Sequence, residues 1–354
     1  MKRIFYFAVT TLFILGTTTR SQAQGYIMLK SGDKQITITE QQVEAFFDNM
    51  EQKISDFAES IDANRIEFSL GGNDSTIEIK MDKNDDVTIS HQNSKNFRGS
   101  NRIISEERQV ASNYEGIEAS RAIKVVLSDR AGSTAIVRAN DNVMPYINIK
   151  EKGGILHISI DDEIRTINNV TAEVNLPKST KITSLKATSA AEIHTEYTIE
   201  SPELEIEANS AADIRIMKAE VSKCDIEISS ASSVSAAIKA TECSIEATSA
   251  AKASVQLLVN HCTAEASSAA DIYLRGEAGT LDLEASSAAD IKATDVNVMV
   301  ATTAQASSGA DIKVNVGKSL QAEASSGGTI LYKSNKHDID IHIKKSSGGS
   351  VRKM

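Results

Sequence analysis

Three cysteines are the residues of this sequence whose type and spacing first suggest chemistry. The same interval separates Cys224 from Cys243 and Cys243 from Cys262, and the chain holds no other cysteine. Thiolates at fixed spacing can hold a metal ion or form a disulfide. No Cys-x-x-Cys pair is present, however, so the usual spacing of a zinc site is missing. The regular interval therefore indicates a structural repeat that sets the cysteine positions.

Acidic residues follow the same repeat in two columns. The repeat is aligned on the second polar residue of each "SSAADI"-like block, which recurs at nearly regular intervals at Ser189, Ser210, Ser230, Ser249, Ser268, Ser287, Ser308, Ser326 and Ser347. Three positions before the serine lie Glu207, Glu227, Glu246, Glu265, Glu284 and Glu323, with Gln305 interrupting. Three positions after it lie Asp213, Asp271, Asp290 and Asp311, with Glu192 in the first coil. Stacked carboxylates form either a solvated face or a weak site for a divalent cation such as Ca²⁺ between coils.

A period of roughly 20 residues, built from short alternating segments, predicts a parallel β-solenoid. Residues two apart in a strand share a face, so Cys224, Ile226 and Ile228 of "CDIEISS" lie on one side. That side must be the interior, because the neighbouring coils repeat it with apolar residues. Leucine takes the cysteine position in other coils, at Leu204, Leu281 and Leu320. The cysteines are therefore expected to be one interior column of buried free thiols that binds no metal.

The aligned serines share the interior phase of the strand that precedes them. We therefore expect them to point inward and to satisfy one another by hydroxyl hydrogen bonds from coil to coil. Two small residues usually follow each serine and allow a tight bend. An apolar residue then returns to the core at Ile193, Ile214, Val234, Ile272, Ile291, Ile312, Ile330 and Val351. Nine equivalent serines indicate a packing rule rather than a catalytic nucleophile.

The chain before the repeat divides into three parts. Residues 1–23 have the basic start, the apolar stretch "IFYFAVTTLFILG" and the small residues of "SQA" that are typical of a signal peptide, so the mature chain is expected to begin at Gln24. Residues 24–92 combine the helical pattern of "TEQQVEAFFDNMEQKISDFAESI" with the alternating "RIEFSL", "STIEIKM" and "VTISH". This pattern predicts a small α+β unit. The polar residues 93–112 are expected to form a linker, and residues 113–354 to form the solenoid domain.

The composition argues against several classes of partner. The formal charge is −10, and it falls to −13 without the three basic residues of the leader. An acidic balance of this size argues against nucleic acid or an anionic membrane surface as the partner. No stretch after the leader is apolar enough to cross a membrane. The six histidines share no column, and the GxSxG, HExxH and P-loop motifs are absent from the sequence.

The region that precedes the repeat carries a family pattern. The stretch "NYEGIEASRAIKVVLSDRAGSTAIVRANDNVMPYINIKEKGGILHISI", followed by "VTAEVNLPKSTKITSLKATSAAEI", resembles the bacterial family called the "putative auto-transporter adhesin, head GIN domain". The resemblance covers about two thirds of the chain, from 113 to 354. It implies a secreted, right-handed parallel β-solenoid of about 20 residues per coil in a Gram-negative envelope. No C-terminal membrane barrel follows the solenoid, so self-export in the manner of an autotransporter is not expected.

Two functions from different classes remain open at this point. The first is a non-enzymatic, adhesin-like protein of the periplasm or cell surface, which binds an unknown protein or glycan partner along its solenoid wall. The candidate binding residues are the outward acids Glu207, Glu227, Glu246, Glu265, Glu284, Asp271, Asp290 and Asp311. No cofactor is expected beyond weakly bound Ca²⁺. The alternative is a β-helix polysaccharide lyase or hydrolase, which would need aromatic platforms and a cleft.

Overall fold

The computed structural model describes residues 26–31, 34–39, 66–72, 75–81, 87–92, 96–162, 164, 166–334 and 338–354. The described residues divide into two compact units. The first contains the residues up to Arg98 together with 162–169, and the second contains residues 99–161 and 170–354. The predicted leader (1–23) and residues 40–61 of the predicted helix lie outside the described residues, whereas Thr39, at the start of that predicted helix, is the last residue of a strand.

The first unit contains a five-stranded antiparallel sheet in the order β2-β1-β3-β4-β5. Its strands are β1 (Tyr26–Ser31), β2 (Lys34–Thr39), β3 (Ile66–Gly72), β4 (Ser75–Met81) and β5 (Val87–Gln92). The meander of β3, β4 and β5 follows the three alternating segments read from the sequence, whereas the β1–β2 hairpin was not predicted. A separate parallel pair joins β6 (Asn96–Arg98) to β13 (Thr166–Asn168).

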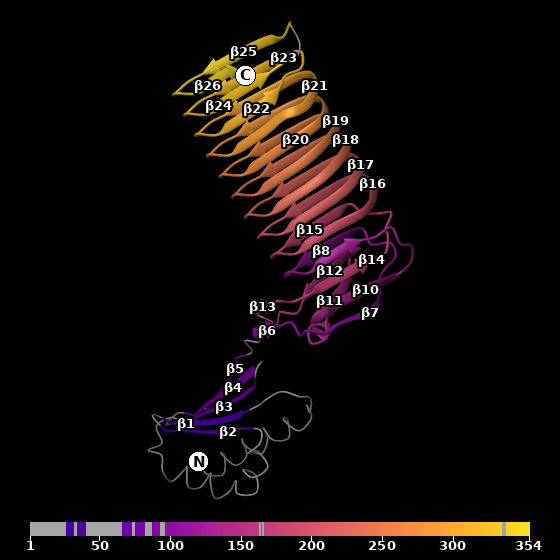
Figure 1. Ribbon diagram of the computed structural model, residues 1–354, viewed down its shortest axis with the longest axis vertical. Helices are drawn as coiled ribbons and strands as arrows, with labels where there is room; N and C mark the ends of the chain where they lie inside the picture. The colour runs from indigo at the N-terminus through magenta and orange to yellow at the C-terminus, as the bar shows by residue number, and fades with distance from the viewer. Residues whose placement is uncertain are drawn as a thin grey trace, which may run out of the picture. The chain divides into compact units, whose positions relative to one another are not determined.

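The second unit is the predicted parallel β-solenoid with a spacing of about 20 residues, and it has about eight turns. Figure 1 shows its coils stacked one on another from β15 to β26. The strands are β15 (Ser184–Thr188), β16 (Glu192–Ala208), β17 (Asp213–Ile228), β18 (Ser233–Ala247), β19 (Lys252–Ala266), β20 (Asp271–Ala285), β21 (Asp290–Ala306), β22 (Asp311–Asn315), β23 (Ser319–Ala324), β24 (Thr329–Lys333), β25 (Asp340–Lys345) and β26 (Ser350–Lys353). Each long strand pairs in parallel with its equivalent in the next coil.

The interior of the solenoid is a thin layer of small apolar side chains. Cys224, Cys243 and Cys262 pair in register and are almost completely buried, with exposed fractions of 0%, 2% and 0%. Leucines continue this column in other coils, as the sequence predicted, at Leu204, Leu281 and Leu320. The predicted return of Ile or Val to the core after each turn is likewise confirmed. Small side chains suit a coil whose opposing strands pack closely.

The aligned serines lie in exposed turns, and the prediction that they point inward is wrong. Ser249 and Ala250 have φ values of 55° and 60°, and the N–H of Ala251 donates to the carbonyl of Thr248 at 3.2 Å. Positive φ at both central residues is the mark of a type I′ turn, which reverses the chain. The strand ends just before each serine, so the inside–outside alternation no longer applies there. Glycine takes the second turn position in the later coils, at Gly309, Gly327 and Gly348.

The first coils of the solenoid are formed out of sequence order. The strands of this region are β7 (Ile103–Gln109), β8 (Gly116–Ser120), β9 (Lys124–Leu127), β10 (Thr134–Asn140), β11 (Ile147–Lys152), β12 (Ile155–Ile160) and β14 (Ala172–Leu176), with a 3₁₀ turn, η1, at Met144–Tyr146. Strand β8 pairs in parallel with both β12 and β15, and β9 pairs with both β14 and β16. The coil of β8 and β9 therefore lies between two coils that follow it in sequence.

Two sequence predictions change in this region. The alternating stretch "IEASRAIKVVL" predicts one strand from its sequence, but Arg121 and Ala122 have φ values of 64° and 55° and form a turn between β8 and β9. The expected linker, 93–112, contains β7, which pairs antiparallel with β10. Arg108 holds β7 in place because its guanidinium donates to the carbonyls of Met144, at 2.9 Å, and Ile147. A polar composition suits β7 because most of its side chains are exposed.

Candidate functional site

The predicted glutamates form one continuous column on the outer face of the solenoid. Parallel strand pairing places Glu207, Glu227, Glu246, Glu265 and Glu284 directly side by side, one per coil. These five residues are called the Glu column below. Neighbouring strands lie about 4.8 Å apart, so the carboxylates repeat at about that spacing. Two unit charges at about 5 Å in water repel by roughly 0.8 kcal/mol, which solvent-exposed side chains tolerate.

Lysines flank the acidic register on both sides. Lys186 pairs in register with Glu207, and its ammonium lies 2.6 Å from that carboxylate. Hydrogen bonding to Glu207 raises the pKa of Lys186. At the other end Gln305 follows the Glu column, then Glu323, and Lys344 lies 2.7 Å from Glu323. Beyond Lys186 the register continues with Glu118, so Lys186 separates the Glu column from one further carboxylate.

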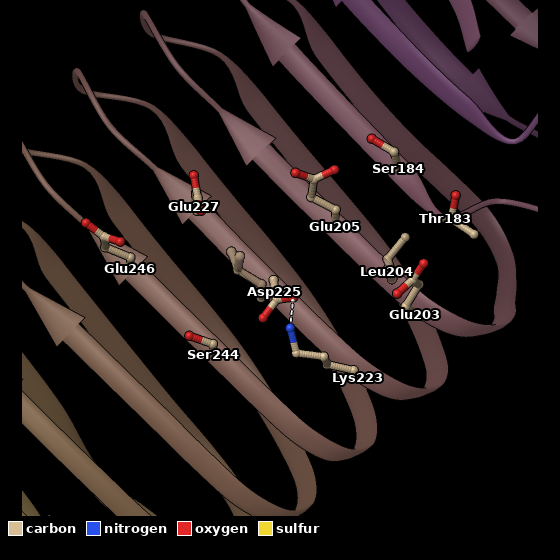
Figure 2. Close-up of a pocket in the computed structure, with 11 residues that line it drawn as sticks. Thr183, Ser184, Glu203, Leu204, Glu205, Lys223, Asp225, Glu227, Ser244 and Glu246 are labelled. Atoms are coloured by element: carbon tan, nitrogen blue, oxygen red, sulfur yellow. Dashed lines mark hydrogen bonds and ion pairs between the residues drawn. The ribbon is translucent and has the colours of Figure 1, made fainter. Parts of the chain in front are cut away.

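A shallow groove of about 390 Å³ runs beside the start of the Glu column. Figure 2 shows its acidic side chains on adjacent coils, with Glu203 and Glu205 on one coil and Asp225 and Glu227 on the next. Lys223 lies 2.6 Å from Asp225, so one cation partly offsets the acids of the groove. Sequence reasoning named only the positions three away from the serine and missed Glu205 and Asp225. Strand alternation could have found them, because they lie two positions before the Glu column on the same face.

The aspartates of three consecutive coils form a separate surface. Asp271, Asp290 and Asp311 pair in register on the strands that follow the turn, and they are called the Asp column below. The predicted column is broken before them, because Ser233 and Lys252 lie between Asp213 and Asp271. Each type I′ turn reverses the chain, so the Glu column and the Asp column face opposite sides of the coil. The structure therefore does not bring the two predicted columns together.

The middle residue of the Asp column, Asp290, lies between two other carboxylates. Desolvation, followed by the neighbouring charges of Asp311 and Asp271, raises the pKa of Asp290, although its side chain is exposed. Among the described residues, no group of three or more His, Cys, Asp or Glu side chains is arranged to hold a metal ion. A carboxylate column of this kind can attract cations without fixing one of them.

The buried cysteine column contributes no side chain to the surface. Hydrogen bonding to Cys243 and burial raise the pKa of both Cys224 and Cys262. The three thiols are unpaired cysteines within the described chain. The thiols of Cys224 and Cys262 are therefore protonated, and a protonated, buried thiol is a poor nucleophile and a poor metal ligand. The described part of the chain also has no helix with the length and apolar character needed to span a bilayer.

A known sequence family covers most of the solenoid. The family described as "Putative auto-transporter adhesin, head GIN domain" matches residues 113–241 and 229–335. These two overlapping matches include the out-of-order first coils and all of the Glu column. No match was found among curated proteins.

A solved structure shows the same fold at low sequence identity. This "putative adhesin" from Parabacteroides distasonis is 18% identical, with a TM-score of 0.53, over 72% of this chain and 98% of that one. A "putative adhesin" from Parabacteroides merdae is also 18% identical over the same shares, with a TM-score of 0.48. A third "putative adhesin", from Bacteroides fragilis, is 15% identical over 72% of this chain and 99% of that one, with a TM-score of 0.39.

Proposed function

Because the chain belongs to the family described as "Putative auto-transporter adhesin, head GIN domain", we propose that it is an exported, non-enzymatic protein that binds a partner along its solenoid wall. The binding surface is the Glu column together with Glu205 and Asp225. The partner is a protein or glycan of the cell envelope that presents cationic groups or is bridged by cations such as Ca²⁺. The Asp column offers a second, smaller surface of the same chemistry on the opposite sheet.

The parallel register of the Glu column is the observation that carries this proposal. Five carboxylates repeat along one face without interruption, and four of them are exposed. An exposed ion pair contributes only about 0.2–1 kcal/mol, so useful affinity requires several coils to act together. Binding of this kind weakens as salt is added, because exposed charges are screened within about 10 Å at 0.1 M.

The alternative, a polysaccharide lyase or hydrolase, has less support. The name of the family and that of the Parabacteroides distasonis structure are those of adhesins rather than enzymes. Of the three tyrosines beyond residue 180, Tyr197 and Tyr332 are buried, which leaves Tyr273 as the aromatic residue on the surface. A sugar-cleaving cleft usually presents several exposed rings together with converging acid and base groups.

Binding of a labelled hexalysine peptide, followed by fluorescence anisotropy, tests the proposal. The triple variant Glu227→Gln, Glu246→Gln, Glu265→Gln should bind about tenfold more weakly at low salt, since three exposed ion pairs are lost. The control Glu196→Gln, Glu200→Gln, Glu277→Gln removes the same charge from exposed sites outside the Glu column. It should bind within about twofold of the unchanged protein.

Ca²⁺ provides the second arm of this test. If cations collect along the Glu column, millimolar Ca²⁺ should displace the peptide more strongly than NaCl of equal ionic strength. Equal losses in the two triple variants would show that overall charge, and not the Glu column, binds the peptide. Cleavage of a polysaccharide, abolished by one Asp or Lys substitution that leaves the fold intact, would replace the proposal with the enzyme alternative.

A further inference from the structure

Charge is unevenly distributed along the solenoid. Between residues 185 and 312, twenty Asp and Glu residues outnumber eight Lys and Arg residues. In the final coil, residues 338–354, four basic residues outnumber two acidic ones, and all four are exposed: Lys344, Lys345, Arg352 and Lys353. The net negative charge of the whole chain argues against an anionic surface as partner. That total, however, combines an acidic solenoid body with a basic final coil, and the final coil alone could bind such a surface. Figure 1 places this end at β25 and β26.

The same coil leaves part of the apolar core uncovered. Ile341 and Ile343 continue the inward columns, in register with Leu320 and Ala322. Ile343 is nevertheless 43% exposed, whereas Ala322 is 1% exposed, because no further strand pairs beyond β25 in the described chain. Met354, whose N–H donates to the carbonyl of Tyr332, is 53% exposed. The end of the solenoid is thus an apolar centre beside basic side chains.

Two of the basic side chains occupy positions that are buried in the preceding coil. Lys345 is in register with the buried Ala324, and Lys353 is in register with the buried Tyr332. Charged residues at inward positions of an edge prevent another strand from pairing there. A second copy stacked on this end would bury both ammonium groups without counter-ions, which is costly. Two such ends would also repel each other.

We propose that this end of the solenoid docks on an anionic lipid bilayer surface, with Ile343 entering the interface and Lys345, Arg352 and Lys353 contacting the headgroups. Apolar side chains next to Lys and Arg are the combination that anchors proteins to anionic bilayers. Lysine suits this place because its alkyl stem lies on apolar surface while its ammonium reaches the polar layer. Lys344 contributes less charge, since it lies 2.7 Å from Glu323.

The acidic body of the solenoid sets the orientation of docking. The Glu column and the Asp column would be repelled by anionic headgroups, so the solenoid approaches the bilayer with its basic end rather than with either acidic wall. Insertion stays shallow because the outer edges of β25 and β26 carry backbone groups that need water or headgroups as partners. The solenoid therefore stands end-on, and both acidic walls remain open to solution.

Vesicle sedimentation tests the docking directly, with the protein as purified after export. The protein should bind vesicles of one part phosphatidylglycerol to two parts phosphatidylcholine more tightly than vesicles of phosphatidylcholine alone. Each Lys near an anionic surface contributes about 1 kcal/mol, so Lys345→Ser with Lys353→Ser should lower the partition coefficient about 30-fold. Arg275→Ser with Lys292→Ser removes equal charge from exposed sites on earlier coils and should change it less than threefold.

Tryptophan fluorescence tests which part of the chain touches the bilayer. The sequence contains no Trp, so a single introduced Trp is an unambiguous reporter. Emission from Ile343→Trp should shift to the blue when the phosphatidylglycerol vesicles are added. Emission from Tyr273→Trp, which replaces a ring that is 37% exposed on an earlier coil, should not shift.

Four results would overturn the proposal. The first is equal binding to both kinds of vesicle, and the second is an equal loss in the tip and control variants. The third is release of the protein from the vesicles by inorganic phosphate to a greater extent than by NaCl of equal ionic strength. This result would show that the basic end binds a small anion rather than a bilayer. The fourth is a concentration-dependent dimer, seen by analytical ultracentrifugation and lost in the Lys345→Ser, Lys353→Ser variant. This result would show that the basic end binds a second copy of the chain.

Discussion

The backbone N–H of Ala231 donates a hydrogen bond to the carbonyl oxygen of Ser249, the turn serine of the next coil, at 3.0 Å. Equivalent bonds join the other turns along the solenoid, such as that from Ala250 to Ser268 at 3.0 Å. The turns are therefore stacked through their backbones, and their serine hydroxyls are not required to point inward. Each turn has to hold two consecutive residues at positive φ, which favours small residues there.

The strain of this turn predicts an unusual stabilising substitution. Ala250 has a φ of 60°, where an L-residue with a Cβ costs roughly 1–2 kcal/mol, and later coils use glycine at this position. Ala250→Gly should raise the free energy of unfolding by about 0.5–1 kcal/mol, after the entropic cost of glycine is subtracted. The adjacent Ala251→Gly, at a buried position, should instead lower it by about 1–2 kcal/mol. Urea unfolding would measure the free energy of unfolding of both variants. An equal loss of stability in the two would show that Ala250 is not strained in the turn.

The turn also explains how far the sequence could predict this fold. Strand alternation and the repeat identified the interior column of Cys224, the apolar residue after each turn and the outward Glu column. Strand alternation could not predict that the serines are exposed. The inside–outside alternation stops where the strand ends, and the sequence does not show where each strand ends. The turn at Arg121 and Ala122 was missed for a related reason, since Arg is rare in a turn formed elsewhere by Ser and Ala.

The order of the first coils was beyond the reach of local patterns. Strand β8 lies between β12 and β15 because long-range pairing decides the order of coils, while alternation reports only that each segment is a strand. The candidate site divides in the same way. Each acidic column is a periodic signal and was found, and its interruption by Lys252, three positions after Ser249, can be seen in the same alignment. The placement of the two columns on opposite sheets, in contrast, depends on the three-dimensional fold.

The cysteine column should remain reduced even after export to an oxidising compartment. Parallel neighbours place their Cβ atoms near the strand spacing of about 4.8 Å, which exceeds the preferred separation of about 3.8 Å in a disulfide. Thiol titration in denaturant without reductant should therefore give close to three thiols per chain. The native protein should react far more slowly, because Cys224, Cys243 and Cys262 are buried. A count of one thiol would instead reveal a bridge between neighbouring coils.

The Asp column should make stability depend on pH through Asp290. Its pKa is raised above the ordinary 3.8 in the folded protein, so ionised Asp290 opposes folding at neutral pH. This cost disappears as the pH falls below 3.8, where the carboxyl is protonated in both states. Asp290→Asn should therefore raise the free energy of unfolding slightly at pH 7, by a few tenths of a kcal/mol for an exposed group, and leave it unchanged at pH 3, as urea unfolding at the two pH values would measure.

The nearby Asp295 provides the control for this prediction. It is in register with Arg275, an opposite charge, and not with another carboxylate. Asp295→Asn should therefore give no stabilisation at pH 7. An equal gain from both substitutions would show that the net negative charge of the chain, and not the Asp column, opposes folding.

The leader predicted from residues 1–23 should be removed during export. Small residues at Ser21 and Ala23 place the cleavage before Gln24. Mass spectrometry of the chain recovered from the cell envelope should show an N-terminus at Gln24. Protease treatment of intact cells would then separate an exposed solenoid from a periplasmic one. Recovery of the chain with Met1 intact would contradict the export prediction.

Thr302 is the polar exception in the column that holds the three cysteines. It lies in register between Leu281 and Leu320, it is 2% exposed, and its hydroxyl finds no hydrogen-bond partner among the described residues. A buried hydroxyl without a partner costs about 1–3 kcal/mol, and valine has almost the same shape. Thr302→Val should therefore stabilise the solenoid by about 1 kcal/mol in urea unfolding. Thr303→Val, on the adjacent half-exposed position, should have no such effect, and a loss of stability from Thr302→Val would show that the hydroxyl is satisfied in solution.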